Sequence, residues 1–199
     1  MMVTSGTDGA AFMRHGEAWS EATELLRSSY RVRMGGAFRG AWLASLSRGL
    51  AARELSIDHL HARRTGNRLW IAELHLIALP SARDPLHIDY SSLTTAGEVA
   101  PSGAFELDSY RLIESRDYGG TLMLTLEAAD SLGLLGSLLG GLAQLNLFPN
   151  ELHIETRGGR AYDSLWLAGA GGSCPSTTLH RAASDLLSRS CKARSPRPA

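Results

Sequence analysis

Long hydrophobic runs and paired cysteines are scarce in this sequence. Its longest apolar-looking stretch, Leu132–Phe148, is interrupted by polar residues and glycines and is too short to span a bilayer. The two cysteines, Cys174 and Cys191, and the lack of an apolar secretory segment after Met1 favour a reduced, cytoplasmic setting. We therefore expect neither a membrane protein nor a disulfide-stabilised secreted domain.

Net charge is also lacking. Twenty basic and twenty acidic residues give a formal net charge of +0 at pH 7, so no overall field would attract nucleic acid or anionic lipid. Lys192 is the only lysine, and this preference for arginine is typical of a high-GC bacterium. Nucleic acid and membranes are therefore not expected as partners.

The hydrophobic residues that are present, 44% of the chain, are enough for real cores, and their period changes along one central stretch. An alternating apolar run from Thr121 predicts a strand. Leucines at three- and four-residue spacing then predict a helix that begins at Asp130 or Ser131 and ends near Asn146. After the helix come two strands, Glu151–Thr156 and Arg160–Leu167, joined by a glycine hairpin.

The same organisation occurs earlier in the chain. Aligning Gly49 with Gly141 places helix leucines on helix leucines without a gap. The same alignment places Leu60-His61 on Leu152-His153 and Gly66-Asn67-Arg68 on Gly158-Gly159-Arg160. The coincidence of helix face, strand and turn indicates two copies of one supersecondary unit.

The first copy continues with a predicted helix over Pro85–Thr95 and a strand over Phe105–Glu114, which gives the order βαββαβ. This is the split-βαβ plan, an antiparallel sheet with both helices on one face. The second copy has its second helix over Ser176–Leu187 but no last strand, so it is either truncated or completed by another segment. A stripe that includes Trp19 predicts an extra amphipathic helix over Gly16–Tyr30.

We therefore predict an α+β protein with two ferredoxin-like (βαββαβ) units and an extra N-terminal helix. The predicted boundaries are an N-terminal tail and helix at 1–30, units at 31–118 and 119–188, and a disordered tail at 189–199. Because units this small bury little apolar surface alone, they are expected to pack through their sheet edges and first helices, within one chain or across a dimer.

Two motifs of the second copy resemble the ACT regulatory domain. Asp130-Ser131-Leu132-Gly133-Leu134-Leu135 is similar to the D-x-x-G-L-L that joins the first strand and helix of that family. Ile154-Glu155-Thr156-Arg157-Gly158-Gly159-Arg160-Ala161-Tyr162-Asp163 is similar to its I-x-T-x-G-x-R-x-x-D hairpin. The nearest likeness is to the ACT modules of bacterial nitrogen-sensing uridylyltransferases.

The resemblance implies that an amino-acid-like ligand binds between two ACT units, close to the loop before the first helix. The implied ligand-binding residues are Asp130, Ser131, Leu132, Gly133 and Phe148. The physical chemistry agrees, because a helix N-terminus favours a carboxylate and Asp130 could accept a hydrogen bond from an ammonium group. As the alternative, Asp130 is only a helix cap and Gly133 serves only packing. The first copy departs from the motif, with Phe38 and Ala41 at these positions.

We therefore expect a stand-alone regulatory protein that binds a small molecule, with a homodimer mate or a regulated protein as partner, and no cofactor or metal. Two alternatives stay open. One is an enzyme of bacterial specialised metabolism that uses the ACT cleft, and the other is an adaptor without a ligand. The residues to test in an enzyme are His59, His61, Glu73, Tyr110 and Asp163. His59, His61 and His75 could also form a metal site, but no carboxylate or cysteine at ligand spacing supports one.

Overall fold

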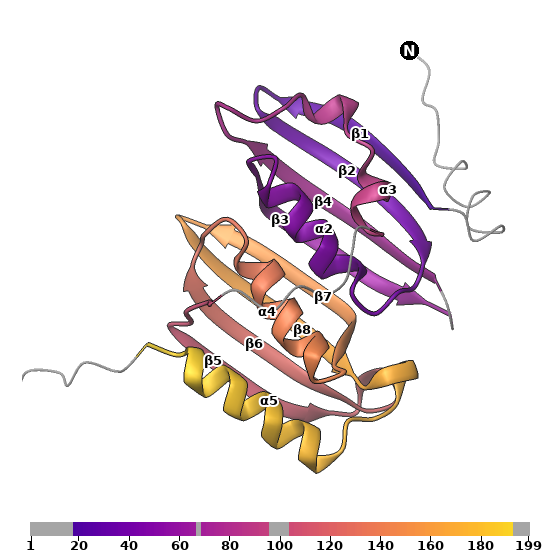
Figure 1. Cartoon of the computed structure of the whole chain (residues 1–199), viewed down its shortest axis with the longest axis vertical. Coiled ribbons are helices and arrows are strands. Elements are labelled where there is room, and N and C mark those ends of the chain that lie inside the picture. The colour runs from indigo at the N-terminus through magenta and orange to yellow at the C-terminus, as the bar shows by residue number, and fades with distance from the viewer. Residues whose placement is uncertain (1–17, 67–68, 96–103, 193–199) are drawn as a thin grey trace, which may run out of the picture.

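The computed structural model describes residues 18–66, 69–95 and 104–192 and shows an α+β protein built on one antiparallel sheet (Figure 1). The strands are β1 (Trp19–Leu26), β2 (Ser29–Ala37), β3 (Leu55–Thr65), β4 (Leu69–Ala78), β5 (Ser109–Ser115), β6 (Thr121–Ala129), β7 (Phe148–Arg157) and β8 (Arg160–Ala168). The α-helices are α2 (Trp42–Ala51), α3 (Tyr90–Leu93), α4 (Leu134–Gln144) and α5 (Thr177–Ser190). Short 3-10 turns are η1 (Pro85–His87), η2 (Asp117–Gly119) and η3 (Ala170–Gly172).

The eight strands lie in the order β1-β2-β4-β3-β7-β8-β6-β5, which divides the sheet into two equivalent halves. Each half reads strand, strand, helix, strand, strand, helix along the chain. The predicted repeat is visible in the backbone itself, since Glu54 and Asn146 follow the first helix of their halves and both have positive φ angles. A duplicated sequence has therefore folded as a duplicated structure.

The two halves are joined where β3 pairs with β7, so that residues His59–Arg63 lie opposite Glu151–Glu155. On one side of this junction α2 packs against α4. Gly136 permits the close approach, because a Cβ at this position would lie 3.1 Å from Cγ of Arg48. The expectation that the copies pack through their sheet edges and first helices is confirmed within one chain.

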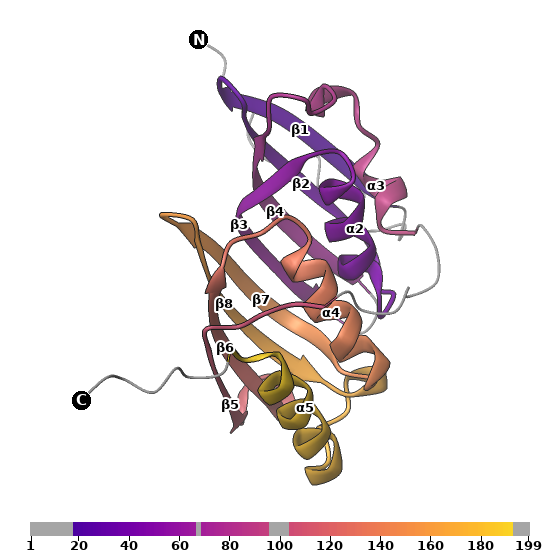
Figure 2. The same cartoon turned by 60° about the vertical axis from the view of Figure 1, so that its left-hand side comes forward.

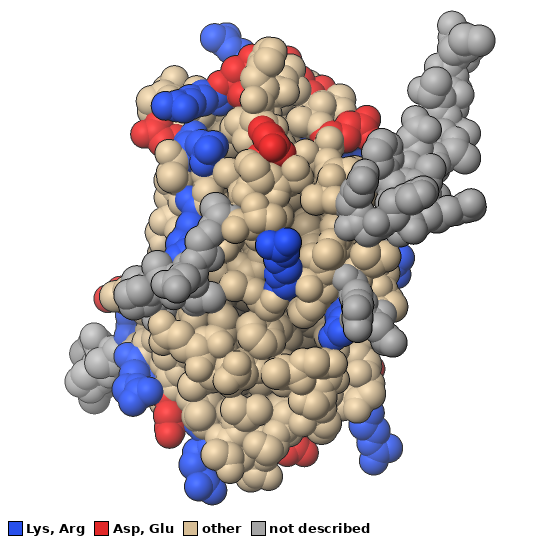
Figure 3. All heavy atoms as spheres, turned by 45° about the vertical axis from the view of Figure 1, so that its right-hand side comes forward, with Lys and Arg blue, Asp and Glu red and all other residues tan. Residues whose placement is uncertain are grey.

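All four described α-helices cover the same face of the sheet (Figure 2), and the core lies between them and the inward side chains of the strands. The residues of α2 and α4 are buried almost all round, because each helix contacts both the sheet and the other helix. The opposite face of the sheet is open to solvent and carries the histidines of β3, β4 and β7. Figure 3 shows that charged groups of both signs are scattered over the face drawn there, most of which is formed by uncharged residues.

The predicted helix over Gly16–Tyr30 is wrong. Residues 19–26 form edge strand β1, which pairs with β2 around a turn at Arg27 and Ser28, where Ser28 has a φ of 65°. The helical stripe was misleading because it placed Leu25 and Leu26 on a buried face, whereas both are exposed at the end of the edge strand. Pairing with β2 determines the structure of this segment, and such pairing cannot be recognised from the local periodicity of the sequence.

The boundary between the halves also differs from the prediction. The strand expected at Phe105–Glu114 to close the first unit is β5, which pairs with β6 and completes the second half. The order βαββαβ is therefore wrong as written, and each half reads ββαββα. This answers how the second copy completes its sheet: the missing strand precedes it in the chain.

Three smaller expectations have mixed outcomes. In place of one helix over Pro85–Thr95 the chain forms η1 and the short α3, and the Asp84 side chain caps η1 by accepting a hydrogen bond from the backbone N–H of Leu86. The helix predicted at Ser176–Leu187 is confirmed as α5, capped by Ser176 and extending to Ser190. The start of the predicted disordered tail is ordered up to Lys192, whereas residues 1–17 and 193–199 lie outside the described part of the chain.

Candidate functional site

A small cleft lies at the junction of the two halves, on the helix-bearing side of the sheet. Its cavity has a volume of about 30 Å³. The second half contributes the loop 130–133, the start of α4 and inward residues of β7 and β8, and the first half contributes Ser47, Ala51, Ser56 and Ile57. The loop that the ACT resemblance singled out therefore faces the other copy.

Gly133 caps α4 and shapes this loop. Its φ of 89° lies in the left-handed region, which residues other than glycine and asparagine rarely adopt. Because α4 begins at Leu134, the helix starts later than predicted and Asp130 is not its N-cap. No side-chain hydrogen bond caps α4, and the N–H of Leu134 donates to the backbone carbonyl of Ser131 at 3.1 Å.

Asp130 instead directs its carboxyl group at the junction. The Thr156 hydroxyl lies between this carboxyl group and the backbone carbonyl of Ile57, to which it donates at 3.2 Å. Burial, together with the charge of Asp58, raises the pKa of Asp130, while the nearby Thr156 hydroxyl acts in the opposite direction. The alternative in which Asp130 only caps the helix is therefore wrong.

Asp163 is the most unusual residue of the cleft. It lies on the inward face of β8, is 3% exposed, and its Oδ1 has no hydrogen-bond partner among the described residues. Burial and the neighbouring charge of Asp130 raise the pKa of Asp163 to about 7, against a backbone hydrogen bond from Glu155 that lowers it. A buried carboxyl group with an unpaired oxygen is expensive unless a donor reaches it, and such groups are enriched at functional sites.

The equivalent place in the first half is filled. Phe38 occupies the position of Asp130, and the guanidinium carbon of Arg64 lies 4.7 Å from the centre of its ring.

Phe148, which was predicted to bind the ligand, instead packs on Gly40, where an added Cβ would lie 2.6 Å from Cε1 of Phe148. In the β3–β4 pairing, Ala72 holds the position that Asp163 has in β8. The two carboxyl groups of the junction cleft therefore have no counterpart at the equivalent positions of the first half, which hold Phe38 and Ala72.

The other predicted ligand residues lie at the rim of the Asp130 cleft. Ser131 is exposed and the Leu132 side chain is 45% exposed, so neither is part of the closed interior. The structure thus brings Asp130, Ser131, Leu132 and Gly133 together with Asp163, and it places Phe148 apart from them.

The five candidate residues for an enzyme do not converge on one cleft. His59, His61 and Glu73 lie on the open face of the sheet, where Glu73 also contacts Arg33. Tyr110 lies on the helix side and donates its hydroxyl hydrogen to the backbone carbonyl of Ser184 in α5 at 3.3 Å. Asp163 lies in the junction cleft. Their separation gives no support to a shared catalytic role.

Sequence reasoning missed two neighbours of His61 on the open face, Glu151 and His153. The repeat itself contained the signal, because it aligned His61 with His153, but the pairing of β3 with β7 that brings them together cannot be read from either copy alone.

Comparison of this chain with protein-family models, with curated protein sequences and with solved structures gives no match. Among the residues that the structure describes, no helix combines the length and the apolar character needed to cross a membrane. The function must therefore be argued from the geometry.

Proposed function

We propose that this protein is a regulatory, ACT-like protein that binds an amino-acid-like molecule in the cleft between its halves. The observation that carries the proposal is the buried carboxyl group of Asp163, whose unpaired oxygen lies beside Asp130 at the junction of the two copies. A ligand ammonium group would supply the missing hydrogen-bond donors and a compensating charge.

The dimensions of the cavity support the ammonium group as the part that enters. A volume of about 30 Å³ is close to that of one water molecule, which is also the size of an ammonium head. The rest of the ligand would lie over the exposed rim at Ser131 and Leu132. A ligand carboxylate would there meet the uncapped N-terminus of α4, where free N–H groups and the helix dipole favour negative charge.

The chain order supports the relationship to ACT units. If β1 were moved behind α3, and β5 behind α5, each half would read βαββαβ, the order of the split-βαβ unit. One chain provides two such units already joined at a sheet edge, so both walls of the cleft are present without a second copy. Occupation of the cleft would then change the α2–α4 contact, and a regulated protein partner could bind the two arrangements with different affinity.

A thermal-shift screen of the full chain tests this function. The ligands are the amino acids, their keto-acid relatives, which lack the ammonium group, and simple amines, which lack the carboxylate. We expect amino acids to raise the melting temperature and the matching keto acids to have no effect. Equal stabilisation by a keto acid would contradict the assignment.

Three variants locate the site. Ala51→Leu extends a side chain from the last turn of α2 into the cleft and should block the ligand, and Asp163→Asn should weaken it by removing the charge. Asp185→Asn, on the exposed face of α5, is the matched control and should behave as the wild type. A hit that binds all three variants with wild-type affinity lies elsewhere on the protein.

A further inference from the structure

His61 and His153 lie directly opposite each other in the β3–β7 ladder, on the open face of the sheet. Their rings are stacked, with centroids 4.5 Å apart and an angle of 23° between the planes. Opposite residues on antiparallel strands have Cβ atoms about 5 Å apart, so both imidazoles reach the same point above the sheet.

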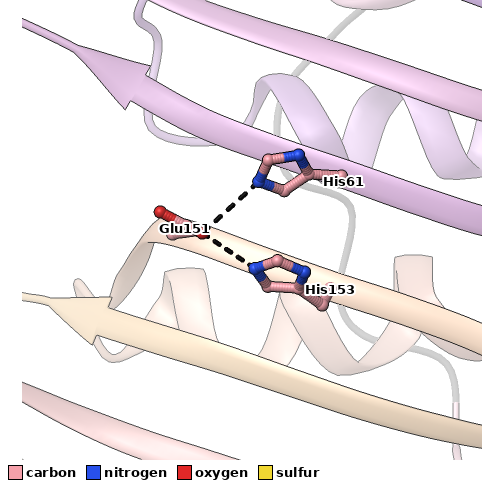
Figure 4. A group of neighbouring side chains, drawn as sticks. All are labelled: His61, Glu151 and His153. Atoms are coloured by element: carbon pink, nitrogen blue, oxygen red, sulfur yellow. Dashed lines mark hydrogen bonds and ion pairs between the residues drawn. The ribbon is translucent and has the colours of Figure 1, made fainter.

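Glu151 reaches that point as well, because it lies two residues before His153 and therefore on the same face of β7. Its Oε1 is 2.8 Å from Nε2 of His153 and 3.3 Å from Nε2 of His61 (Figure 4). One ligand atom from each of the three residues lies within 4.8 Å of the others. The three side chains thus present two nitrogens and one oxygen to a single small volume.

The carboxylate is held in this orientation from behind. The Tyr118 hydroxyl donates to Oε2 of Glu151, which leaves Oε1 directed at the two histidines. Trp166 lies edge-on to both His153 and Tyr118, at centroid distances of 5.5 Å and 6.2 Å, and its Nε1 donates to Oδ2 of Asp117 at 3.2 Å. Outer partners of this kind commonly orient the ligands of metal sites.

Exposure distinguishes the carboxylate from the two rings. The Glu151 side chain is 16% exposed, whereas those of His61 and His153 are each 51% exposed. Glu151 is therefore the buried, immobilised member of the cluster. The side of the histidines that faces away from the sheet is open to solvent. An ion bound here would keep room for water or another small ligand.

We propose that His61, Glu151 and His153 form a binding site for a divalent transition-metal ion, with zinc as the best match. Imidazole nitrogen with one carboxylate oxygen is a donor set that suits zinc, at bond lengths of about 2.0–2.2 Å. Tetrahedral ligand atoms at those lengths lie roughly 3.3 Å apart, close to the 3.3 Å and 2.8 Å that separate the Glu151 oxygen from the nitrogens of His61 and His153. Three protein ligands leave at least one position for solvent.

The position of the site gives the ion a structural consequence. His61 belongs to the first half and the other two ligands belong to the second half, so a bound ion would connect the halves at the strand pair that joins them. Because the metal binds the folded junction and not the separated halves, its binding should raise the melting temperature of the whole chain.

Isothermal titration calorimetry of the chelator-treated full chain with zinc chloride alone tests the proposal. We expect one ion per chain for the wild type and for His87→Ala, a control in which the substituted histidine lies on η1, away from this face. His61→Ala and His153→Ala should each lose the binding. Tyr118→Phe should retain one ion with an affinity reduced by about 10-fold, since it removes only the group behind Glu151.

A second measurement does not depend on how well the variants fold. Cobalt(II) added to the wild type should give the intense visible absorption of a tetrahedral or five-coordinate site, and zinc should displace it. Absence of zinc binding by the wild type would overturn the proposal. So would a cobalt spectrum typical of the hydrated ion, or unchanged binding in a folded His61→Ala or His153→Ala variant.

Discussion

His61 and His153 occupy equivalent positions in the two halves and lie opposite each other as a register pair of the β3–β7 ladder. In an antiparallel pair of equivalent strands, only the position on the local two-fold axis faces its own counterpart, and here His61 and His153 hold that position. A single histidine in the ancestral unit would therefore become a pair after duplication. The same logic does not apply to the junction cleft, where Asp130 and Asp163 face a partner half that has Phe38 and Ala72 at the corresponding positions.

The burial of Asp163 makes stability depend on pH. Because its pKa is raised to about 7 in the folded protein, the folded state binds the proton more tightly than the unfolded chain does. This contribution to the free energy of unfolding is full below about pH 4 and is lost as pH rises to about 7, on the order of 4 kcal/mol in total. Denaturant unfolding of wild type and Asp163→Asn at several pH values across this range gives the free energy of unfolding as a function of pH. The two plots against pH should differ in slope, and parallel plots would contradict this prediction.

Gly133 should resist substitution for a backbone reason. Its φ of 89° is strained for any other residue, although an added Cβ would meet only Cβ of Ala51, at 4.0 Å. We expect Gly133→Ala to lower the free energy of unfolding by about 1–2 kcal/mol, and Gly133→Asn to cost less because asparagine tolerates this conformation. Chemical denaturation measures both, and equal costs for alanine and asparagine would indicate packing rather than strain.

The first half should not fold as a stable monomer. Seven residues of α2 are buried, including Trp42, Ser45 and Ser47, which reflects contact with α4 as well as with its own sheet. A fragment of residues 18–95 would expose that surface together with the edge of β3. Size-exclusion chromatography and thermal unfolding should show association or a broad, weak transition. A monomer with a sharp transition would mean that the halves are independent domains.

The sequence predicted the parts of the fold that rest on local signals. The αL position of Asn146, the glycine hairpin at Gly158-Gly159 and the helix beginning after Ser176 are confirmed, because each depends on residues close together in the chain. The strand β1 was missed because its turn at Ser28 contains neither glycine nor asparagine. Extending the repeat alignment toward the N-terminus would have aligned the residues of β1 approximately with those of β5. The duplication therefore contained the information that a strand lies there.

The candidate site was predicted in part. The loop at Asp130 and Gly133 was found from its motif, and the ACT resemblance implied that it faces the other unit, as it does in the structure. Asp163 was named from the sequence as a motif residue and as an enzyme candidate, but its burial and its unpaired oxygen were not predicted, since an aspartate in an alternating strand gives no sign of facing inward without partners. Its burial depends on the packing of α2 and α4 over β8, and this tertiary contact cannot be predicted from the local sequence.

Release of a proton from Asp163 on ligand binding tests the proposed ammonium site most directly. An ammonium group favours the ionised carboxylate, and at about pH 6 a group with a pKa of about 7 is mostly protonated when the cleft is free. Calorimetric titration of the best amino-acid ligand at that pH, in two buffers of different ionisation enthalpy, measures the protons released. We expect a release approaching one proton per ligand, which disappears in Asp163→Asn together with most of the affinity. Binding without proton release, or with the same release in Asp163→Asn, would contradict it.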